Sequence, residues 1–364
     1  MKIKEITTYL EELAPLASQE SYDNSGLIVG DPSTVVNGAL ISLDCIESTV
    51  EEAINLGVNL IIAHHPIVFK GLKKLNGKNY IERTILKAIK NDIAIYAIHT
   101  NFDNYNFGVN REIGERLNLT GLRILAPKQN VLTKLVCFVP EKSADSVAKA
   151  MFEAGAGRIG NYSECSFKTE GSGTFKPMEG ANPVEGEVGK LSVENEFRLE
   201  VLVSNHLLNK VVKAMKEAHP YEEVAHEMYS ILNDNQTEGA GMIGELETAV
   251  DELEFLSALK KTFGCGVVRH TALSGKKVKL VAFCGGSGSF LLNQAKRAGA
   301  DIFITGDFKY HEFFDAENQI VIADIGHFES EQFTSNRLAA ILTKKFPKFA
   351  VHLTEVNTNP INYF

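Results

Sequence analysis

Two adjacent histidines end an apolar run in the stretch LIIAHHPIVF, residues 60–69. Pro66 follows them at once, and proline both lacks a backbone N–H and restricts the residue before it to an extended conformation. The pair is therefore expected at the exit of a buried strand, where His64 and His65 can turn toward one site. Imidazoles in such a place can bind a metal ion or move a proton. From this stretch alone, a pair that only hydrogen-bonds a turn is an equally good interpretation.

Two further stretches bring histidines and carboxylates to the ends of predicted strands. IHTNFD supplies His99 and Asp103 in a polar turn. GHFESE supplies His327 and Glu331, whose i, i+4 spacing puts them on one side of a helix that begins near Phe328. Taken singly, the aspartate could close an Asx turn, and the later pair could be an ordinary solvated helix start. Their shared position favours one site, because ligands gather at the carboxyl ends of parallel strands.

Together these strand exits supply a donor set of imidazoles and carboxylates. That set is too large for one closed structural zinc site, and it fits two divalent ions with bridging carboxylates and bound water. Because no cysteine is required, zinc, manganese or iron is favoured over a thiolate-bound metal. The candidate metal ligands are His64, His65, Asp103, His327 and Glu331.

The elements that must position these side chains alternate between strand and helix in the N-terminal part of the chain. Apolar runs that end at Asp44, His64 and His99 are separated by helical patterns. Such alternation predicts an α/β fold, with a parallel sheet and helices on its faces. The predicted strands cover residues 38–44, 58–63 and 93–98, and the predicted helices cover 47–56 and 80–91.

The C-terminal part repeats the same alternation of strand and helix. AINLGVNLIIAHH, residues 53–65, aligns without gaps with AKRAGADIFITGD, residues 295–307. A match of this length can arise by chance, but similar elements precede and follow it in both parts. We therefore expect two related α/β lobes that form one domain, residues 1–126 and 236–364.

The middle of the chain has a different pattern. Residues 127–235 are predicted to run strand, helix, a long Gly-rich stretch, strand, helix and strand. This order fits a ferredoxin-like α+β domain with an antiparallel sheet. Insertion of such a domain into a surface loop of the α/β host accounts for the interruption between the two lobes.

A glycine-rich stretch, CGGSGSF at residues 284–290, follows a predicted strand of the C-terminal lobe. It lacks the lysine of a P-loop and the full spacing of a dinucleotide-binding motif. A tight strand-to-helix turn is the simpler interpretation, and weak anion binding at the following helix stays open.

Composition narrows the class of protein. The chain has 364 residues, is 44% hydrophobic and carries a formal net charge of −9. This acidic balance argues against general binding to nucleic acid or to an anionic membrane. No apolar stretch of membrane-spanning length and no signal-peptide core is present. The five cysteines are widely spaced without a CxxC pair, which favours reduced thiols and a cytoplasmic location.

These motifs resemble those of the Nif-three-like family, whose members are widely named GTP cyclohydrolase I type 2 homologue. SYDNSGLIVGD resembles the family's Trp-Asp-Asn-x-Gly-Leu stretch, with Tyr22 in place of the tryptophan. LDCIESTVEEA, IIAHHP, HTNFD, TGDFKYH and GHFESE are similar to its other motifs and follow in the same order. The resemblance covers essentially the whole chain, and residues 127–235 resemble the PII/CutA-like insert of long bacterial members.

The resemblance implies a dinuclear metal site between two α/β lobes, held by the five residues named above. It also implies a toroidal homohexamer, built as a trimer of dimers with its sites facing the interior. By motif, His311 and Glu329 lie close to this site and are the candidate general acid or base, with Asp307 as a weaker candidate.

Two main hypotheses from different classes follow, while a third, nucleic-acid binding around a ring, is suggested by the family's toroidal shape and opposed by the charge of −9. The first is a metal-dependent hydrolase, in which Asp103 and Glu331 bridge two divalent ions and a metal-bound hydroxide attacks a nucleotide, a phosphoester or a purine-type C–N bond. The family name adds GTP as a small-molecule substrate. The second is a non-enzymatic, hexameric, metal-binding regulatory or scaffold protein, whose insert senses a small molecule or contacts a partner. An open coordination position would favour the enzyme over the scaffold.

Overall fold

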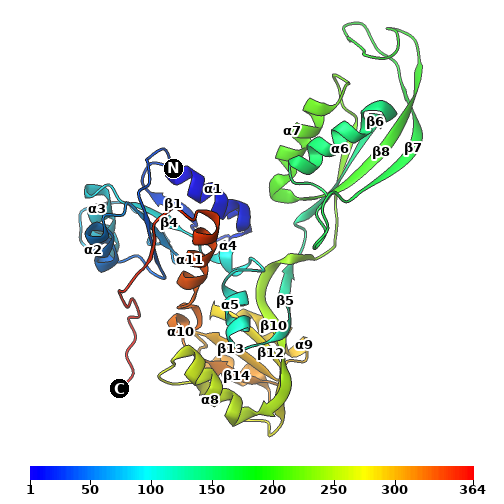
Figure 1. Ribbon diagram of the computed structural model, residues 1–364. Coiled ribbons are helices and arrows are strands. Elements are labelled where there is room, and N and C mark those ends of the chain that lie inside the picture. The colour runs from blue at the N-terminus through cyan, green and yellow to red at the C-terminus, as the bar shows by residue number, and fades with distance from the viewer. The chain divides into compact units, whose positions relative to one another are not determined.

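The computed structural model describes all 364 residues of the chain (Figure 1). They form two compact units, Met1–Pro127 with Thr237–Phe364, and Lys128–Gln236. Each unit has its own buried apolar side chains, in three clusters in the first unit and one in the second. None of the helices has the length and apolar character that crossing a membrane requires.

The N-terminal part of the first unit builds a five-stranded sheet in the order β1-β4-β3-β2-β15. Four of its strands run parallel, and β1 pairs antiparallel with β4 at one edge. The central strands are continuous apolar runs because both of their faces are buried. The strands are β1 Gly26–Val29, β2 Ala39–Ser42, β3 Leu60–Ala63, β4 Ala94–Ala97 and β15 Val351–Leu353.

Helices cover both faces of this sheet, as Figure 1 shows. On one face α2 and α3 bury side chains such as Val50 and Ile85 against Ile61. On the other face α1 and α11 bury side chains such as Ile6 and Leu342. The helices are α1 Ile3–Leu13, α2 Glu47–Leu56, α3 Tyr80–Lys90 and α11 Thr334–Lys345.

The C-terminal part of the same unit builds a six-stranded sheet in the order β11-β14-β13-β12-β10-β5. β12, β13 and β14 run parallel, whereas β10 and β11 pair antiparallel with β12 and β14. The strands are β5 Thr120–Lys128, β10 Asn235–Asp251, β11 Arg269–His270, β12 Lys277–Ser287, β13 Ile302–Gly306 and β14 Val321–Asp324. The helices are α4 Thr100–Asp103, α5 Val109–Arg116, α8 Glu252–Phe263, α9 Leu292–Arg297 and α10 His327–Glu331.

The two sheets share the order of their central strands. In each sheet, three parallel strands lie side by side in chain order, and an antiparallel strand lies beside the last of them. The resulting orders are β1-β4-β3-β2 in one sheet and β11-β14-β13-β12 in the other. This is the order that the gapless alignment of the two lobes requires. One cluster of buried side chains includes Tyr96 and Phe102 from the N-terminal part and Phe283 and Ile304 from the C-terminal part, so the two lobes share a core.

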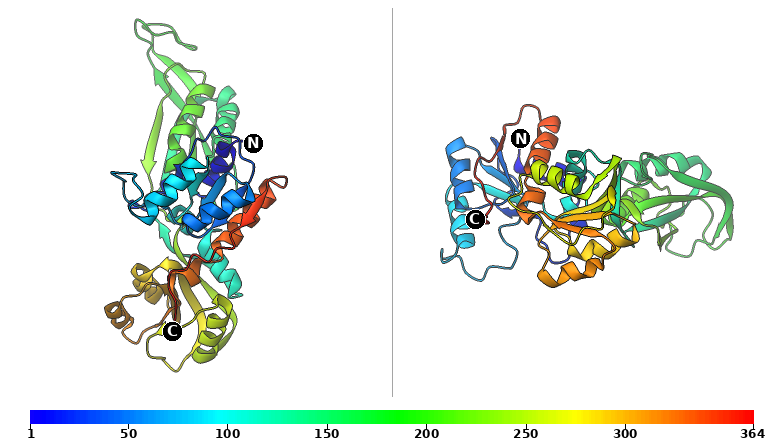
Figure 2. Two further views of the ribbon diagram at one scale, coloured as in Figure 1. Left: turned by 90° about the vertical axis from the view of Figure 1, so that its left-hand side faces the viewer. Right: turned by 90° about the horizontal axis from the view of Figure 1, so that it is seen from below.

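The second unit has a four-stranded antiparallel sheet in the order β7-β8-β6-β9. Its two helices contact each other and bury side chains such as Val147 and Val211 against the sheet residue Leu199. Figure 2 shows both helices on the same face of this sheet. The elements are β6 Leu132–Pro140, α6 Ala144–Glu153, β7 Ser166–Phe175, β8 Ser192–Ser204, α7 Leu208–Ala218 and β9 His226–Ser230.

Removal of the second unit should leave the first unit folded. The change is a deletion of Lys128–Gln236 with a short Gly-Ser turn between β5 and β10, which are neighbours in one sheet. We expect cooperative thermal unfolding of the shortened chain by circular dichroism, because no cluster of buried apolar side chains includes residues of both units. The isolated segment 128–236 should unfold cooperatively as well. A shortened chain without a cooperative transition would contradict this division.

Candidate metal centre

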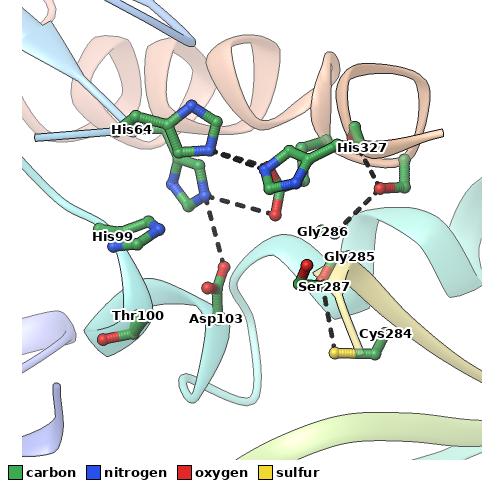
Figure 3. A network of polar contacts seen from close by, with 12 residues as sticks. His64, His99, Thr100, Asp103, Cys284, Gly285, Gly286, Ser287 and His327 are labelled. Carbon is green, nitrogen blue, oxygen red and sulfur yellow. Dashed lines mark hydrogen bonds and ion pairs between the residues drawn. The ribbon is translucent and has the colours of Figure 1, made fainter. Parts of the chain in front are cut away.

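The strand exits of the first unit's two sheets meet at one place. His64 and His65 follow β3, and the backbone N–H of each still donates to the strand beside it, to the carbonyl oxygens of Ser42 and Leu43 at 3.1 and 2.9 Å. Asp103 ends the short helix α4 after β4, and α10 follows β14. Figure 3 shows the side chains of His64, Asp103 and His327 converging from these separate elements.

One group of three donor atoms lies around the Glu331 carboxylate. Its Oε2 is 3.0 Å from His65 Nε2 and 3.0 Å from His327 Nε2. The two Nε2 atoms are 3.2 Å apart. Two imidazole nitrogens and a carboxylate oxygen that face one another so closely form one of the groups that could hold a metal ion.

A second group lies on the other side of the same carboxylate. His64 Nε2 is 3.5 Å from Asp103 Oδ1 and 3.8 Å from Glu331 Oε1. His64 Nε2 and Asp103 Oδ1 are both buried without a hydrogen-bond partner. A buried polar atom without a partner is costly, so these two atoms fit a bound ion better than they fit each other. His64, Asp103 and Glu331 are a second group that could hold a metal ion.

The outer nitrogen of every histidine in the cluster is held by an acceptor. A carbonyl or carboxylate oxygen can only accept a hydrogen bond, so each Nδ1–H must donate to it. In the neutral ring, Nε2 then carries a free lone pair that faces the centre of the cluster. This arrangement orients an imidazole as a metal ligand. The acceptors are Ile98 O for His64 at 2.8 Å, Asp44 for His65 at 2.7 Å, Asp23 for His99 at 2.8 Å and Asp307 for His327 at 2.7 Å.

The protonation states of the metal-free site divide the histidines into two kinds. Burial lowers the pKa of His64 to about 4, so this imidazole is neutral. Burial alone would also lower the pKa of His65 and His327, but Asp44 and Glu331 raise the pKa of His65 to about 9, and Glu331 and Asp307 raise that of His327 to about 11. Without metal, the latter two imidazoles are therefore cations that balance the buried carboxylates.

The carboxylates of Asp103 and Glu331 also differ in the direction of their pKa shifts. Burial and the neighbouring charge of Glu331 raise the pKa of Asp103 well above its usual range. The Glu331 side chain is more deeply buried, at 3% exposed against 22% for Asp103, but the imidazoles of His327, His64 and His65 hold its pKa well below its usual range. Positive charge at this place, supplied by protons or by metal ions, is what allows a carboxylate to stay ionised in the interior.

The glycine-rich stretch 284–290 forms the irregular end of β12, up to Ser287, and the turn into the 3-10 helix Ser289–Leu291, and it packs against the cluster. Gly286 has a φ of +61°, and a Cβ on it would lie 2.4 Å from Glu331 Oε1. Its backbone N–H donates to the Ser330 hydroxyl at 2.9 Å. The glycine is therefore needed for the close approach of this stretch to the carboxylate. Cys284 in the same stretch is a buried thiol whose pKa is raised by burial and by the nearby carboxylates, so it offers no thiolate ligand.

Two candidates for acid–base chemistry lie apart from the cluster. His311 is exposed in the 3-10 helix Tyr310–Ala316, where its ring contacts Tyr310 and Phe314. Glu329 is buried, but its Oε1 accepts from the Asn359 side chain at 3.4 Å. Because residues two apart on a helix point to different sides, Glu329 cannot share the direction of its neighbours in α10. The structure brings neither side chain to the donor atoms, whereas Asp307 contacts the cluster through His327.

Several residues of the site lie outside the set of five predicted ligands. His99 belongs to the HTNFD stretch, and its Nδ1 is held by Asp23 like that of a ligand, so that it forms a candidate metal group with His64 and His65. Thr358 lies in the C-terminal tail and donates through Oγ1 to Asp44 Oδ2 at 2.6 Å. Asp44 ends a predicted strand, so the sequence offered a signal for it, but none for the threonine.

A cavity of about 570 Å³ opens over the cluster. His65, His327 and Glu331 form part of its lining, and Thr358 and Pro360 of the C-terminal tail form another part. Aromatic side chains complete the lining, namely Tyr22, Phe69, Tyr80 and Phe290. A volume of this size is that of a small-molecule site.

Comparison with known proteins gives one family. A model of the Duf34/NIF3 (NGG1p interacting factor 3) family matches residues 1–360. The chain is 38% identical over 358 residues to the GTP cyclohydrolase 1 type 2 homolog of Halalkalibacterium halodurans, covering 97% of this chain and 96% of that relative. The homolog of the same name from Bacillus subtilis is 36% identical over 367 residues, covering 99% and 98%. A crystal structure of a Bacillus cereus protein related to NIF3 has a TM-score of 0.86 at 38% identity, covering 100% of this chain and 99% of that chain.

Loss of the acceptor on His65 should weaken metal binding. We expect Asp44→Asn to lower the affinity for zinc by about 10- to 100-fold, because the ring loses its fixed orientation and some basicity. Thr358→Val should have a smaller effect in the same direction. Thr354→Val is the matched control. Thr354 lies in the same tail as Thr358, but its hydroxyl donates to Glu52 of α2, away from the cluster. Competition with a chelator gives the three affinities, and equal values for the Asp44 and Thr354 variants would contradict this role.

Metal binding should release protons near neutral pH. His65 and His327, with pKa values raised to about 9 and about 11, must each lose a proton to become ligands. We expect about two protons released per subunit at pH 7.5, measured by titration calorimetry in buffers of different ionisation enthalpy. Because both pKa values are raised, their contribution to the stability of the metal-free protein is full below about pH 6.5 and is lost as the pH rises through about 9 for His65 and about 11 for His327. Metal uptake without proton release would contradict these protonation states.

Proposed function

The chain belongs to the Duf34/NIF3 family, as its motifs predicted, and from this membership and the geometry of the cluster we propose that it is a metal-dependent hydrolase with two divalent ions per subunit. The observation that supports this most is the position of Glu331. Its two oxygens face two separate groups of donor atoms, one with His65 and His327 and the other with His64 and Asp103. A carboxylate between two such groups suits a bridge between two ions.

Nitrogen and oxygen donors of this kind favour zinc, manganese or iron. Bound ions would lower the pKa of a shared water molecule, which is the chemistry that they supply to a hydrolase. Glu331 and Asp103, which both line the cavity, would hold the ions. His99, fixed through Nδ1 by Asp23 and lining the cavity, faces the reaction space and can position a water molecule or substrate group by hydrogen bonding.

A nucleotide, a phosphoester or a purine-type C–N bond is the proposed class of substrate. The relatives' name, GTP cyclohydrolase 1 type 2 homolog, supports a nucleotide. The cavity supports a small molecule, because its volume of about 570 Å³ holds a compound of nucleotide size and its lining combines aromatic rings with the metal-binding groups.

A non-enzymatic metal-binding regulatory protein is the alternative, and one observation favours it. The second unit encloses a cavity of its own, of about 670 Å³, lined by aromatic side chains such as Phe175 and Tyr221. We propose that this unit, residues 127–235, is a ferredoxin-like domain of PII/CutA type, since its elements follow the order βαββαβ and its sheet the order β7-β8-β6-β9. A small molecule bound there could regulate the site on the lobes 1–126 and 236–364.

Assembly into a homohexamer, a trimer of dimers, is part of the same proposal. Large apolar side chains remain exposed on the second unit, where a monomer would leave them in water. They include Phe167, Leu191, Val193 and Met228. Contact between subunits through such side chains would support a closed assembly.

Elemental analysis and hydrolysis assays test the proposed function together. We expect nearly two ions per subunit in the wild type. His65→Ala should lose one ion, Glu331→Ala should lose both because its carboxylate faces both groups, and both variants should lose turnover of a nucleotide and phosphoester panel. Circular dichroism should show that each variant is folded.

His311→Ala and Glu329→Gln are the matched controls, because these side chains lie outside the cluster. We expect them to keep their metal and their turnover. Loss of turnover at full metal content would instead assign them an acid–base role. A wild type that binds metal but hydrolyses no compound of the panel would favour the regulatory alternative, and one that binds no metal would rule out both.

A further inference from the structure

Four lysines lie in one short loop beside the cavity. The loop connects β3 to α3 and reads KGLKKLNGK, Lys70–Lys78, and we call it the lysine loop. The residues on either side of it, Phe69 and Tyr80, both line the cavity. Its lysines are Lys70, Lys73, Lys74 and Lys78, and all are exposed.

None of these lysines is neutralised by a carboxylate. Their side chains form no ion pair, whereas Arg83 and Lys87, in the helix that follows the loop, pair with Glu47 and Glu51. The carboxylate nearest in sequence, Glu82, is already engaged by backbone and amide donors. It accepts from the N–H groups of Asn76 and Lys78, both at 3.0 Å. Four unpaired positive charges in nine residues are unusual in a chain with a net charge of −9.

The ends of the lysine loop are fixed at the cavity. Before the loop, the Asn24 side chain donates to the carbonyl oxygen of Val68 at 2.7 Å. After it, Glu82 holds the backbone as described, and Asn79 caps α3 by accepting from the Glu82 N–H at 2.9 Å. The lysines are therefore tethered within a few residues of Phe69 and Tyr80. The N-terminus of α3 adds the positive end of a helix dipole at the same rim.

The only side chains in the lining of the cavity that can carry positive charge are the imidazoles of His65, His99 and His327. The lining also includes the carboxylates of Glu20, Asp44, Asp103 and Glu331, but no lysine or arginine. An anionic group inside would meet positive charge only at the floor, from these imidazoles or from bound metal ions, whereas outside the rim it would meet the lysine loop. Negative groups of a ligand are thus attracted either to the floor of the cavity or to the lysine loop outside it. The carboxylates of the lining repel such groups in the space between these two places.

The aromatic side chains between these two places suit a planar ring. Phe69 is 46% exposed and Tyr80 is 53% exposed, and the Phe69 ring also contacts His99 in a T-shaped arrangement, so both rings are partly open to a ligand. A ring between them would direct one end of the ligand to the metal-binding groups and the other end to the lysines.

We infer that the lysine loop binds the phosphate groups of the substrate while the substrate's planar ring lies in the cavity, so that the substrate is a nucleotide or a similar phosphorylated heterocycle whose ring end faces the metal centre. The part of this inference that places a reaction at the ring rests on the proposed function, whereas the part that concerns binding of the phosphate groups does not. Lysine suits the role, because its compact charge binds phosphate without requiring a fixed geometry.

The test compares a nucleoside with its phosphates. Binding of guanosine, GMP and GTP, and of the adenine counterparts, is measured by titration calorimetry on full-length protein with matched metal content. The loop variant is Lys70→Gln, Lys73→Gln, Lys74→Gln. The control variant is Lys260→Gln, Lys261→Gln, Lys276→Gln, which removes the same charge from exposed lysines of the first unit that do not line the cavity.

In the wild type we expect the nucleotides to bind at least about tenfold more tightly than the nucleoside, as several partly exposed charge pairs would give. The loop variant should lose most of this preference and leave nucleoside binding unchanged. The control variant should bind like the wild type. Added salt should weaken nucleotide binding to the wild type more than to the loop variant.

Other results would overturn the inference. These are equal binding of nucleosides and nucleotides, an equal loss in both variants, or no binding of any of the six compounds at millimolar concentration. Tight binding of a single-stranded oligonucleotide without binding of GMP would assign the loop to nucleic acid instead. Because turnover is not measured, a protein that binds nucleotides through the loop but hydrolyses none would contradict the proposed function and leave this inference standing.

Discussion

The burial of one carboxylate organises the first unit. Glu331 is only 3% exposed, and an isolated charge at that depth would cost several kcal/mol. Three imidazoles from two sheets surround it, His64 and His65 from one and His327 from α10 beside the other. The lobes therefore meet where positive charge is required, and either protons or metal ions can supply it. The same residues thus balance charge in the metal-free state and form the groups that could hold a metal ion.

The surroundings of the histidines extend this constraint outward. Each ring is fixed by an acceptor on Nδ1, and the acceptors come from the ends of further strands and from the loop after β13. Asp44 is in turn held by Thr358, so the C-terminal tail supports a ligand and lines the cavity. The glycine turn around Gly286 allows a strand end to approach the carboxylate closely. Positioning of the donor atoms thus depends on segments from the whole length of the first unit.

Negative and positive side chains occupy different places around the cavity. The floor holds carboxylates that bound ions would neutralise, the walls are aromatic, and the unpaired cations lie outside the rim in Lys70–Lys78. A hydrolase acting on an anionic substrate needs such a separation, because the overall charge of −9 would otherwise repel that substrate. The arrangement links the metal centre, the cavity and the acidic composition of the chain in one electrostatic scheme.

The sequence by itself determined the family, the α/β alternation and the five residues that lie together at the strand exits. It could do so because parallel strands place their carboxyl ends at one edge, and because the spacing of His327 and Glu331 fixes their common side of a helix. Only the tertiary structure decided the rest. Glu329 lies in the right motif but points away, because helix geometry turns a residue two positions on to another side. Thr358 meets Asp44 only because the fold brings the C-terminal tail to a strand exit, and a local sequence pattern cannot show a contact between residues so far apart in the chain.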